Sequence, residues 1–183
     1  LYYRATQRLH KRALKEASGD YTHQLSLSNT EREELHRLAH LMRTAPCTPL
    51  KMPLPSLTIS TDASLEGWGA TCGHRSLRGK WDTQESSLHI NMLELLTVQK
   101  AVLKWTGLLN GKTVLFLIDN TTALAYLRNR GGTQSLDLCN LALEIWTLFH
   151  RYKILPVFQY LCSEDNLDAD ALSRGEASSL SWV

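Results

Sequence analysis

The sequence lacks an uninterrupted apolar run near the roughly 18 residues that a membrane-spanning helix needs. It also lacks the charged and then apolar opening that directs a chain to secretion. We therefore expect neither a membrane protein nor a secreted one. No internal repeat or low-complexity stretch is present, which excludes a repeat array. Because the first residue is Leu1 and not methionine, we expect the chain to be a piece of a longer product.

The four cysteines lack the paired spacing of a zinc ribbon or a disulfide scaffold. They lie far apart in the chain, at Cys47, Cys72, Cys139 and Cys162. Reduced thiols are typical of an intracellular protein, so we expect a cytoplasmic or nuclear location.

Net charge is also low, at +2, and does not indicate nucleic-acid binding by itself. Basic residues do recur at helical spacing between Arg4 and Lys15. Such a stripe fits either contact with a phosphate backbone or a solvated helix face.

Prolines are few, and three of the five fall within residues 49–55. This clustering predicts an extended linker over 48–56. Before it, residues 1–47 form a predicted helical segment, in which Ser28 and Glu31 fit a capping box. A second helix there should bury one apolar face, with Leu35 and Met42 among its members. After the linker we expect an α/β domain over 57–176 and a tail over 177–183.

The pattern of the second part changes from hairpin strands to alternating helices and strands. We predict strands at 57–62, 67–72, 77–81, 113–118 and 154–161. We predict helices at 91–105, 121–128 and 167–173, and a further helix capped by Ser135. Pro156 places the fifth strand at a sheet edge. This order predicts an α/β fold with a five-stranded mixed sheet flanked by helices.

Four acidic residues occupy positions where an acid is hard to explain structurally. Asp62 and Asp119 each end an apolar strand, and these carboxyl ends lie side by side if the strands are parallel neighbours. Glu94 begins an otherwise apolar helical stripe and should point inward. Asp170 follows Asn166 by four residues, on the same face of a short helix.

Clustered carboxylates repel one another, and a bound cation removes that penalty. Magnesium prefers oxygen ligands, and two such ions could support phosphate chemistry. Each acid alone also fits a helix cap, a surface charge or a salt bridge. Asp168 competes with Asp170, but the two lie roughly 200° apart on a helix, so only one can face the site. The joint pattern predicts a divalent-metal site.

The segments around these acids resemble the ribonuclease H domain of retroelement reverse transcriptases, in particular those of DIRS and Ngaro-type retrotransposons. The resemblance covers residues about 55–176. It rests on five segments in this order, namely Thr61-Asp62-Ala63-Ser64, Gly67-Trp68-Gly69-Ala70, His89-Ile90-Asn91-Met92-Leu93-Glu94, Ile118-Asp119-Asn120-Thr121-Thr122-Ala123 and the run from Asn166 to Arg174. The N-terminal helices resemble, more weakly, the thumb or connection region that precedes this domain.

This resemblance implies a ribonuclease H-like fold and hydrolysis of the RNA strand of an RNA–DNA hybrid by two Mg²⁺ ions, which Mn²⁺ could replace. It implies that the catalytic and metal-binding residues are Asp62, Glu94, Asp119 and Asp170. It also implies substrate-binding positions at Ser64, Asn91, Asn120 and Thr121. The implied partners are the hybrid and an upstream reverse transcriptase polymerase domain in the same polyprotein.

The sequence departs from the family in three ways. Residues 160–163 replace a His-Ile-Pro-Gly-like segment, a mobile-loop histidine has no counterpart, and no basic handle follows residues 121–128. Two alternative functions therefore stay open. One is a catalytically weak scaffold or binding domain of the same fold, and the other is a nuclease or transposase of that fold that cuts DNA.

Overall fold

The computed structural model divides the chain into two units, Leu1–Met52 and Pro53–Val183. It describes residues 4–44 and 53–175, and each unit is described here by itself. The predicted tail, 177–183, lies outside the described residues, as does most of the predicted linker, 48–56.

The first unit contains two helices, α1 (Arg4–Glu16) and α2 (Asn29–Thr44). The predicted capping box is confirmed, since the Ser28 N–H and hydroxyl both donate to the Glu31 carboxylate. Buried Glu34 joins the two helices by accepting bonds from the Thr6 backbone N–H and hydroxyl, both at 2.7 Å. Met42 is exposed, so the predicted apolar face of α2 does not include it.

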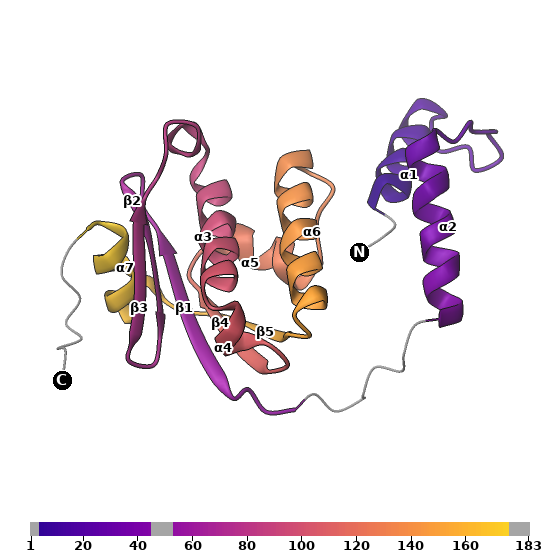
Figure 1. Cartoon of the computed structure of the whole chain (residues 1–183). Coiled ribbons are helices and arrows are strands. Elements are labelled where there is room, and N and C mark those ends of the chain that lie inside the picture. Colours follow the sequence, from indigo (N-terminus) through magenta and orange to yellow (C-terminus); the bar gives the residue numbers. More distant parts are fainter. Residues whose placement is uncertain (1–3, 45–52, 176–183) are drawn as a thin grey trace. The chain divides into compact units, whose positions relative to one another are not determined.

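The second unit is built on one five-stranded sheet in the order β3-β2-β1-β4-β5 (Figure 1). Strands β1–β2 and β2–β3 pair antiparallel, whereas β1–β4 and β4–β5 pair parallel. The strands are β1 (Leu57–Ala63), β2 (Gly67–Cys72), β3 (Arg75–Lys80), β4 (Thr113–Ile118) and β5 (Leu155–Tyr160). The predicted mixed sheet is confirmed, and Pro156 lies on an edge strand as expected.

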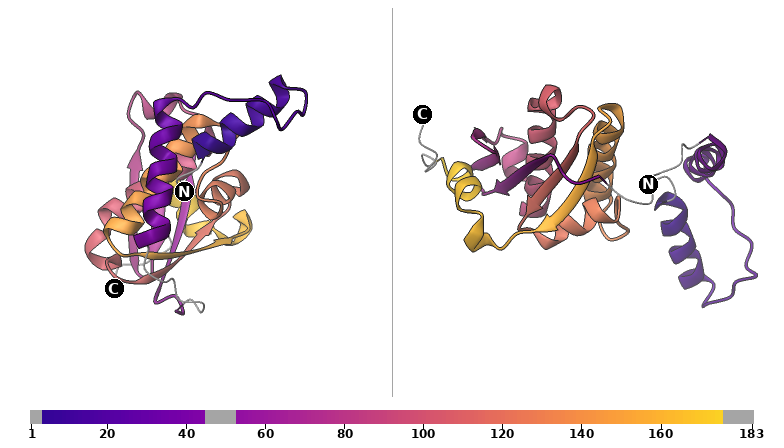
Figure 2. Two further views of the ribbon diagram at one scale, coloured as in Figure 1. Left: turned by 90° about the vertical axis from the view of Figure 1, so that its right-hand side faces the viewer. Right: turned by 90° about the horizontal axis from the view of Figure 1, so that it is seen from below.

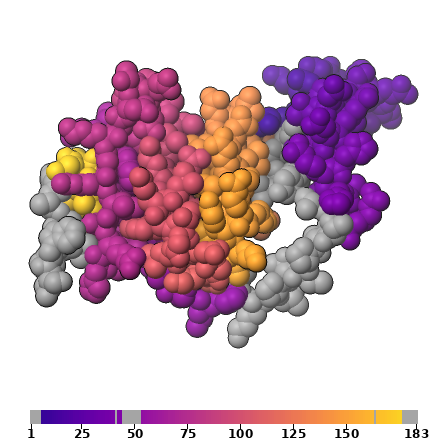
Figure 3. Space-filling model, in the orientation of Figure 1, coloured from indigo at the N-terminus to yellow at the C-terminus, as the bar shows by residue number. Residues whose placement is uncertain are grey.

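Helices cover both faces of this sheet. They are η1 (Glu85–Ser87), α3 (Ile90–Lys104), α4 (Thr106–Leu109), α5 (Thr121–Arg128), α6 (Leu136–Arg151), η2 (Ser163–Asp165) and α7 (Leu167–Ser173). Helices α3, α5 and α6 pack together on one face, and α7 lies alone on the other (Figures 1 and 2). In the space-filling view, α3 and α6 lie on the visible face of this unit, beside the segment of β2 and β3 (Figure 3). No helix among the described residues is long and apolar enough to cross a membrane.

The core lies between the sheet and the helices of the larger layer. Phe116 of β4 packs against Phe149 of α6 and Phe158 of β5, with ring centroids 5.4 and 5.7 Å away. Trp146 closes this aromatic group, and its Nε1–H donates to the Leu127 carbonyl at 3.0 Å. The interpretation of the helical stripes as core-facing is therefore confirmed for α6.

The third strand differs from its prediction, because it starts at Arg75 and ends at Lys80, not at 77–81. Trp81 leaves the strand because it is drawn into a cluster of buried side chains with Ala63, Trp68 and Leu93. Its Nε1–H donates to the Ser64 carbonyl at 2.8 Å.

Two glycines of β2 allow α7 to lie close against the sheet. A Cβ at Gly69 would stand 2.4 Å from the Ala169 carbonyl oxygen and 2.6 Å from the Leu172 Cβ. A Cβ at Gly67 would stand 2.5 Å from the Gly79 carbonyl oxygen. The predicted close approach of backbone at these glycines is confirmed, and it fixes where α7 presents its side chains.

Gly69→Ala is expected to destabilise the second unit by roughly 1–3 kcal/mol, because the new methyl group meets backbone that cannot rotate away. The matched control is Gly107→Ala in α4, where a Cβ meets no atom within 4 Å. That change should be neutral or slightly stabilising, because alanine favours helix over glycine. Chemical denaturation of both variants measures the difference, and equal stabilities would contradict the close packing of α7.

Candidate functional site

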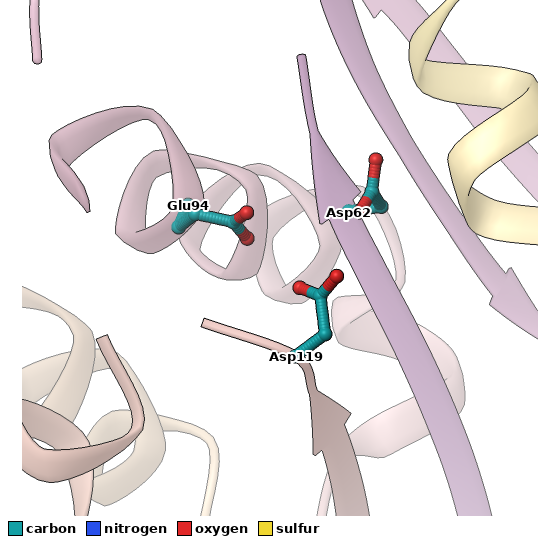
Figure 4. Close-up of side chains that lie close together, drawn as sticks. All are labelled: Asp62, Glu94 and Asp119. Carbon is teal, nitrogen blue, oxygen red and sulfur yellow. The ribbon is translucent and has the colours of Figure 1, made fainter. Parts of the chain in front are cut away.

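Three carboxylates converge at the carboxyl ends of two parallel strands. Asp62 lies near the end of β1, Asp119 follows β4, and Glu94 projects from the second turn of α3 toward them (Figure 4). The last parallel pair of the β1–β4 ladder is Thr61 with Ile118, so the two aspartates occupy the next step. One oxygen of each carboxylate lies within 4.8 Å of the others.

Burial makes this cluster electrostatically costly when it is metal-free. Asp62 and Glu94 are both buried. Loss of water raises the pKa of Glu94 to about 9, and the charges of Asp119 and Asp62 act in the same direction. Burial likewise raises the pKa of Asp62 to about 6, against the opposing effect of the nearby Ser173 hydroxyl. The site therefore favours either protons or a cation.

The donor set fits a hard divalent cation. All three ligand groups are carboxylates, which are the donors that Mg²⁺ and Mn²⁺ prefer. The Glu94 Oε2 atom is buried and has no hydrogen-bond partner among the described residues. A buried carboxylate oxygen without a partner is costly, and a coordinated ion would satisfy it. The arrangement can thus hold a divalent cation.

The fourth predicted acid, Asp170, lies close by but outside this group of three. Its side chain is 39% exposed, and its Oδ1 accepts a charge-assisted hydrogen bond from Arg174 Nε at 2.9 Å. The charge of Asp170 still contributes to the raised pKa of Asp62. The competing Asp168 is likewise only partly buried.

Two of the predicted substrate-binding residues are hydrogen-bonded to each other. Asn120 Nδ2 donates to Asn91 Oδ1 at 3.0 Å, while Asn120 Oδ1 accepts from the Ala123 backbone N–H and caps α5. Asn91 stands in the first turn of α3, whose cap is the imidazole of His89. The starts of α3 and α5 are thereby joined beside Glu94 and Asp119.

The other two predicted residues differ in their surroundings. The Ser64 hydroxyl donates to the Ser173 carbonyl at 2.7 Å and accepts from the backbone N–H groups of Glu66 and Gly67, both at 3.1 Å. This hydroxyl therefore orders the β1–β2 turn and ties it to α7. Thr121 is exposed at the first position of α5, where it is accessible.

Asn166 holds the start of α7 to β1, a role that the sequence did not reveal. It is 3% exposed, and its Nδ2 donates to the Thr61 carbonyl at 3.1 Å. The bond spans 105 residues of sequence. The sequence signal that could have indicated this role is an asparagine among the acids of residues 164–170. Its bonding partner, however, depends on tertiary structure.

Comparison with known proteins identifies the fold. No protein family matches the chain, and no curated protein is similar to it. Among solved structures, the chain is similar to ribonuclease H1 of the archaeon Halobacterium salinarum NRC-1, with a TM-score of 0.54 and 13% identity over 66% of this chain and 98% of that one. It is also similar to LC11-RNase H1 in complex with an RNA/DNA hybrid, with a TM-score of 0.51 and 12% identity over 66% and 96%.

A third similar structure is the prototype foamy virus protease-reverse transcriptase, with a TM-score of 0.41 and 16% identity over 86% of this chain and 21% of that one. From the two higher-scoring structures and the sheet order, the second unit has a ribonuclease H-like fold, as the sequence predicted. Identities this low show the fold and leave the activity to be argued from the site.

Proposed function

We propose that this chain is a ribonuclease H that hydrolyses the RNA strand of RNA–DNA hybrids. The observation that carries the proposal is the group of three carboxylates within 4.8 Å of one another, in which the buried Glu94 Oε2 has no partner among the described residues. The group stands at the carboxyl ends of parallel strands, where α/β folds place their ligands.

Asp62, Glu94 and Asp119 would hold Mg²⁺, or Mn²⁺ in its place, and Asp170 would complete the set of four acids. Bound in pairs, such ions supply an activated water and stabilisation of the leaving oxygen in phosphodiester hydrolysis. The chain's own contribution is a group of carboxylates that the fold already holds together, with Asp62 and Glu94 buried.

The joined asparagines, Asn91 and Asn120, would recognise the RNA strand. Their amides lie beside the acids and present both donors and acceptors. The 2′-hydroxyl is both donor and acceptor and distinguishes RNA from DNA. Exposed Thr121 would add a contact, and Ser64 would position the turn that faces the same strand.

The context that we propose is a retroelement polyprotein of the DIRS or Ngaro type. The support for it is the sequence resemblance of the five segments around the acids. The N-terminal helical segment, 1–47, would be thumb or connection, followed by a linker over 48–56 and the ribonuclease H domain over 57–176. An upstream polymerase domain would supply the hybrid, inside the cell.

The decisive experiment compares three substrates of one sequence, an RNA–DNA hybrid, duplex DNA and duplex RNA, each with Mg²⁺ and with chelator. We expect metal-dependent cleavage of the RNA strand of the hybrid and less than about one hundredth of that rate on the other two. Cleavage of duplex DNA would instead favour a DNA-cutting nuclease or transposase. No cleavage, with no thermal stabilisation by Mg²⁺, would favour a scaffold.

A further inference from the structure

A groove of about 330 Å³ lies beside the candidate site, between the C-terminal end of α7 and strands β2 and β3. The side chains that line it include three cations and one acid. The cations are Arg78, Lys80 and Arg174, and the acid is Glu66. All three cations are exposed, and nothing in the proposed catalysis uses Arg78 or Lys80.

The pairing of β2 with β3 builds this groove. Gly67 pairs with Lys80 and Gly69 with Arg78, and Leu77 packs into the core cluster on the opposite face of the sheet. Since side chains alternate along a strand, Arg78 and Lys80 stand on the face that carries α7. Gly69 is covered by α7, whereas the backbone of Gly67 and Gly79 lines the groove, so the cationic side chains border the hollow at the C-terminal end of α7.

The charge of the groove suits an anion. Arg78, Lys80 and Arg174 line the groove together with one carboxylate, Glu66, and Arg174 is also paired with Asp170, so positive charge remains in excess. Arg78 Nη1 donates to the Gly175 carbonyl at 3.3 Å, which anchors the guanidinium without neutralising its charge. A guanidinium has five N–H donors in a planar fork, so this bond is compatible with a phosphate as a further acceptor.

Residues of α7 connect the groove to the candidate site. Arg174 lines the groove and also donates from Nε to Asp170 at 2.9 Å. Ser173, another lining residue, accepts at its carbonyl from the Ser64 hydroxyl of the β1–β2 turn. The groove and Asp170 thus lie on either side of Arg174, within reach of one nucleic-acid strand.

We propose that this groove binds a backbone phosphate of the RNA strand, on the strand that is cut and close to the cut bond. The inference rests on the proposed function and adds to it a binding site for the substrate. Arg78 and Lys80 bind the phosphate, and Arg174 connects the groove to Asp170. Phosphate contacts of this kind fix the register of a strand without reading its sequence.

The test uses the full chain carrying Asp119→Asn, so that a fluorescent hybrid is bound and not cut. Adding Arg78→Gln and Lys80→Gln should weaken binding roughly tenfold at moderate salt. It should also lower the salt slope, which is the dependence of the logarithm of affinity on the logarithm of salt concentration, by about one for each lost phosphate contact. The matched control is Lys104→Gln with Arg151→Gln, two exposed cations at the ends of α3 and α6. Their removal should leave the slope unchanged.

Two more measurements test the charge of the groove and the identity of the strand that it contacts. Glu66→Gln removes the acid at the rim and should strengthen binding about twofold to threefold. In the cleaving parent chain, a neutral methylphosphonate placed near the cut in the RNA strand should slow cleavage, and the same linkage in the DNA strand should not. In the Arg78 and Lys80 double variant, the neutral RNA linkage should slow cleavage little further, since the phosphate contact is already absent.

The outcomes separate the two proposals. If the parent chain cleaves the hybrid but the double variant keeps the parent's salt slope, the groove proposal is wrong and the proposed function stands. A fall in thermal midpoint with an unchanged slope would show that Arg78 and Lys80 only stabilise the end of α7, and would also overturn the groove. If the parent neither binds nor cleaves the hybrid, the proposed function fails and the groove proposal fails with it.

Discussion

Asp119→Asn is expected to reduce Mg²⁺-dependent cleavage of an RNA–DNA hybrid by about 10³-fold or more. The change keeps the size of the side chain and removes one of the three charges that lie within 4.8 Å of one another. A thousandfold loss corresponds to about 4 kcal/mol of transition-state stabilisation, within the range that metal-ion catalysis supplies. Initial rates on the labelled hybrid, measured over a series of Mg²⁺ concentrations, give the effect.

The matched control is Asp137→Asn, which removes an equal charge from an exposed position in the first turn of α6. Its cleavage rate should stay within about twofold of the parent. The Asp119 variant should also keep or exceed the parent's thermal midpoint in chelator, because removing its charge relieves repulsion on Asp62 and Glu94. Retention of more than a tenth of the parent's rate would show that the cluster is not the catalytic site.

The sequence predicted the arrangement of three of the acids because each prediction used a local pattern. An apolar run ending in an acid indicates the carboxyl end of a buried strand, which placed Asp62 and Asp119. A helical stripe turned Glu94 inward, and it is 4% exposed. The one non-local assumption was that β1 and β4 are parallel neighbours, and it is confirmed.

The features that were missed depend on pairing between distant segments. The basic groove exists because Arg78 and Lys80 stand opposite Gly69 and Gly67, and this register cannot be read from a short edge strand alone. The bond between Asn91 and Asn120 likewise joins two helix starts that are 29 residues apart. Periodicity reports which face a residue occupies and does not report which residue it meets there.

Asp170 illustrates the same limit within the candidate site. Helical spacing put it on the face of Asn166, and the short helix 167–173 was predicted with its observed bounds. Spacing also puts Arg174 one turn later, but whether that guanidinium or a metal ion neutralises Asp170 depends on the surroundings. In the structure Arg174 is the partner. The ligand role of Asp170 therefore stays a proposal, while the group of three is defined by its geometry.

Burial of Asp62 and Glu94 also makes the stability of the metal-free chain depend on pH, with a sign opposite to that of a salt-bridged carboxylate. Glu94 ionises near 4.5 in an unfolded chain, whereas burial raises its pKa to about 9 in the fold. Asp62 moves from 3.8 to about 6. Between these values the folded chain binds more protons than the unfolded chain, so the free energy of unfolding falls as the pH rises.

We therefore expect the metal-free chain to have a lower thermal midpoint at pH 8 than at pH 5. The free energy of unfolding should fall by on the order of 2–4 kcal/mol, mainly because of Glu94. Mg²⁺ should recover much of this loss at pH 8, where it replaces the missing proton. At pH 5 its effect should be small, since it must compete with protons already bound. Thermal melts at the two pH values, each with Mg²⁺ or with chelator, give the four thermal midpoints to be compared.

Glu94→Gln tests the cause, because glutamine has the same shape and no charge to bury. In chelator at pH 8 the variant should melt roughly 5–10 °C above the parent, and its midpoint should vary little between pH 5 and pH 8 except for the smaller share from Asp62. Mg²⁺ should no longer stabilise it, and hybrid cleavage should be lost. Glu164→Gln, at an exposed position, is the matched control and should behave as the parent does. A Glu94 variant that is less stable than the parent at pH 8 in chelator would mean that this carboxylate is neutralised by a protein group, and the case for a cation at its unpartnered oxygen would then fail.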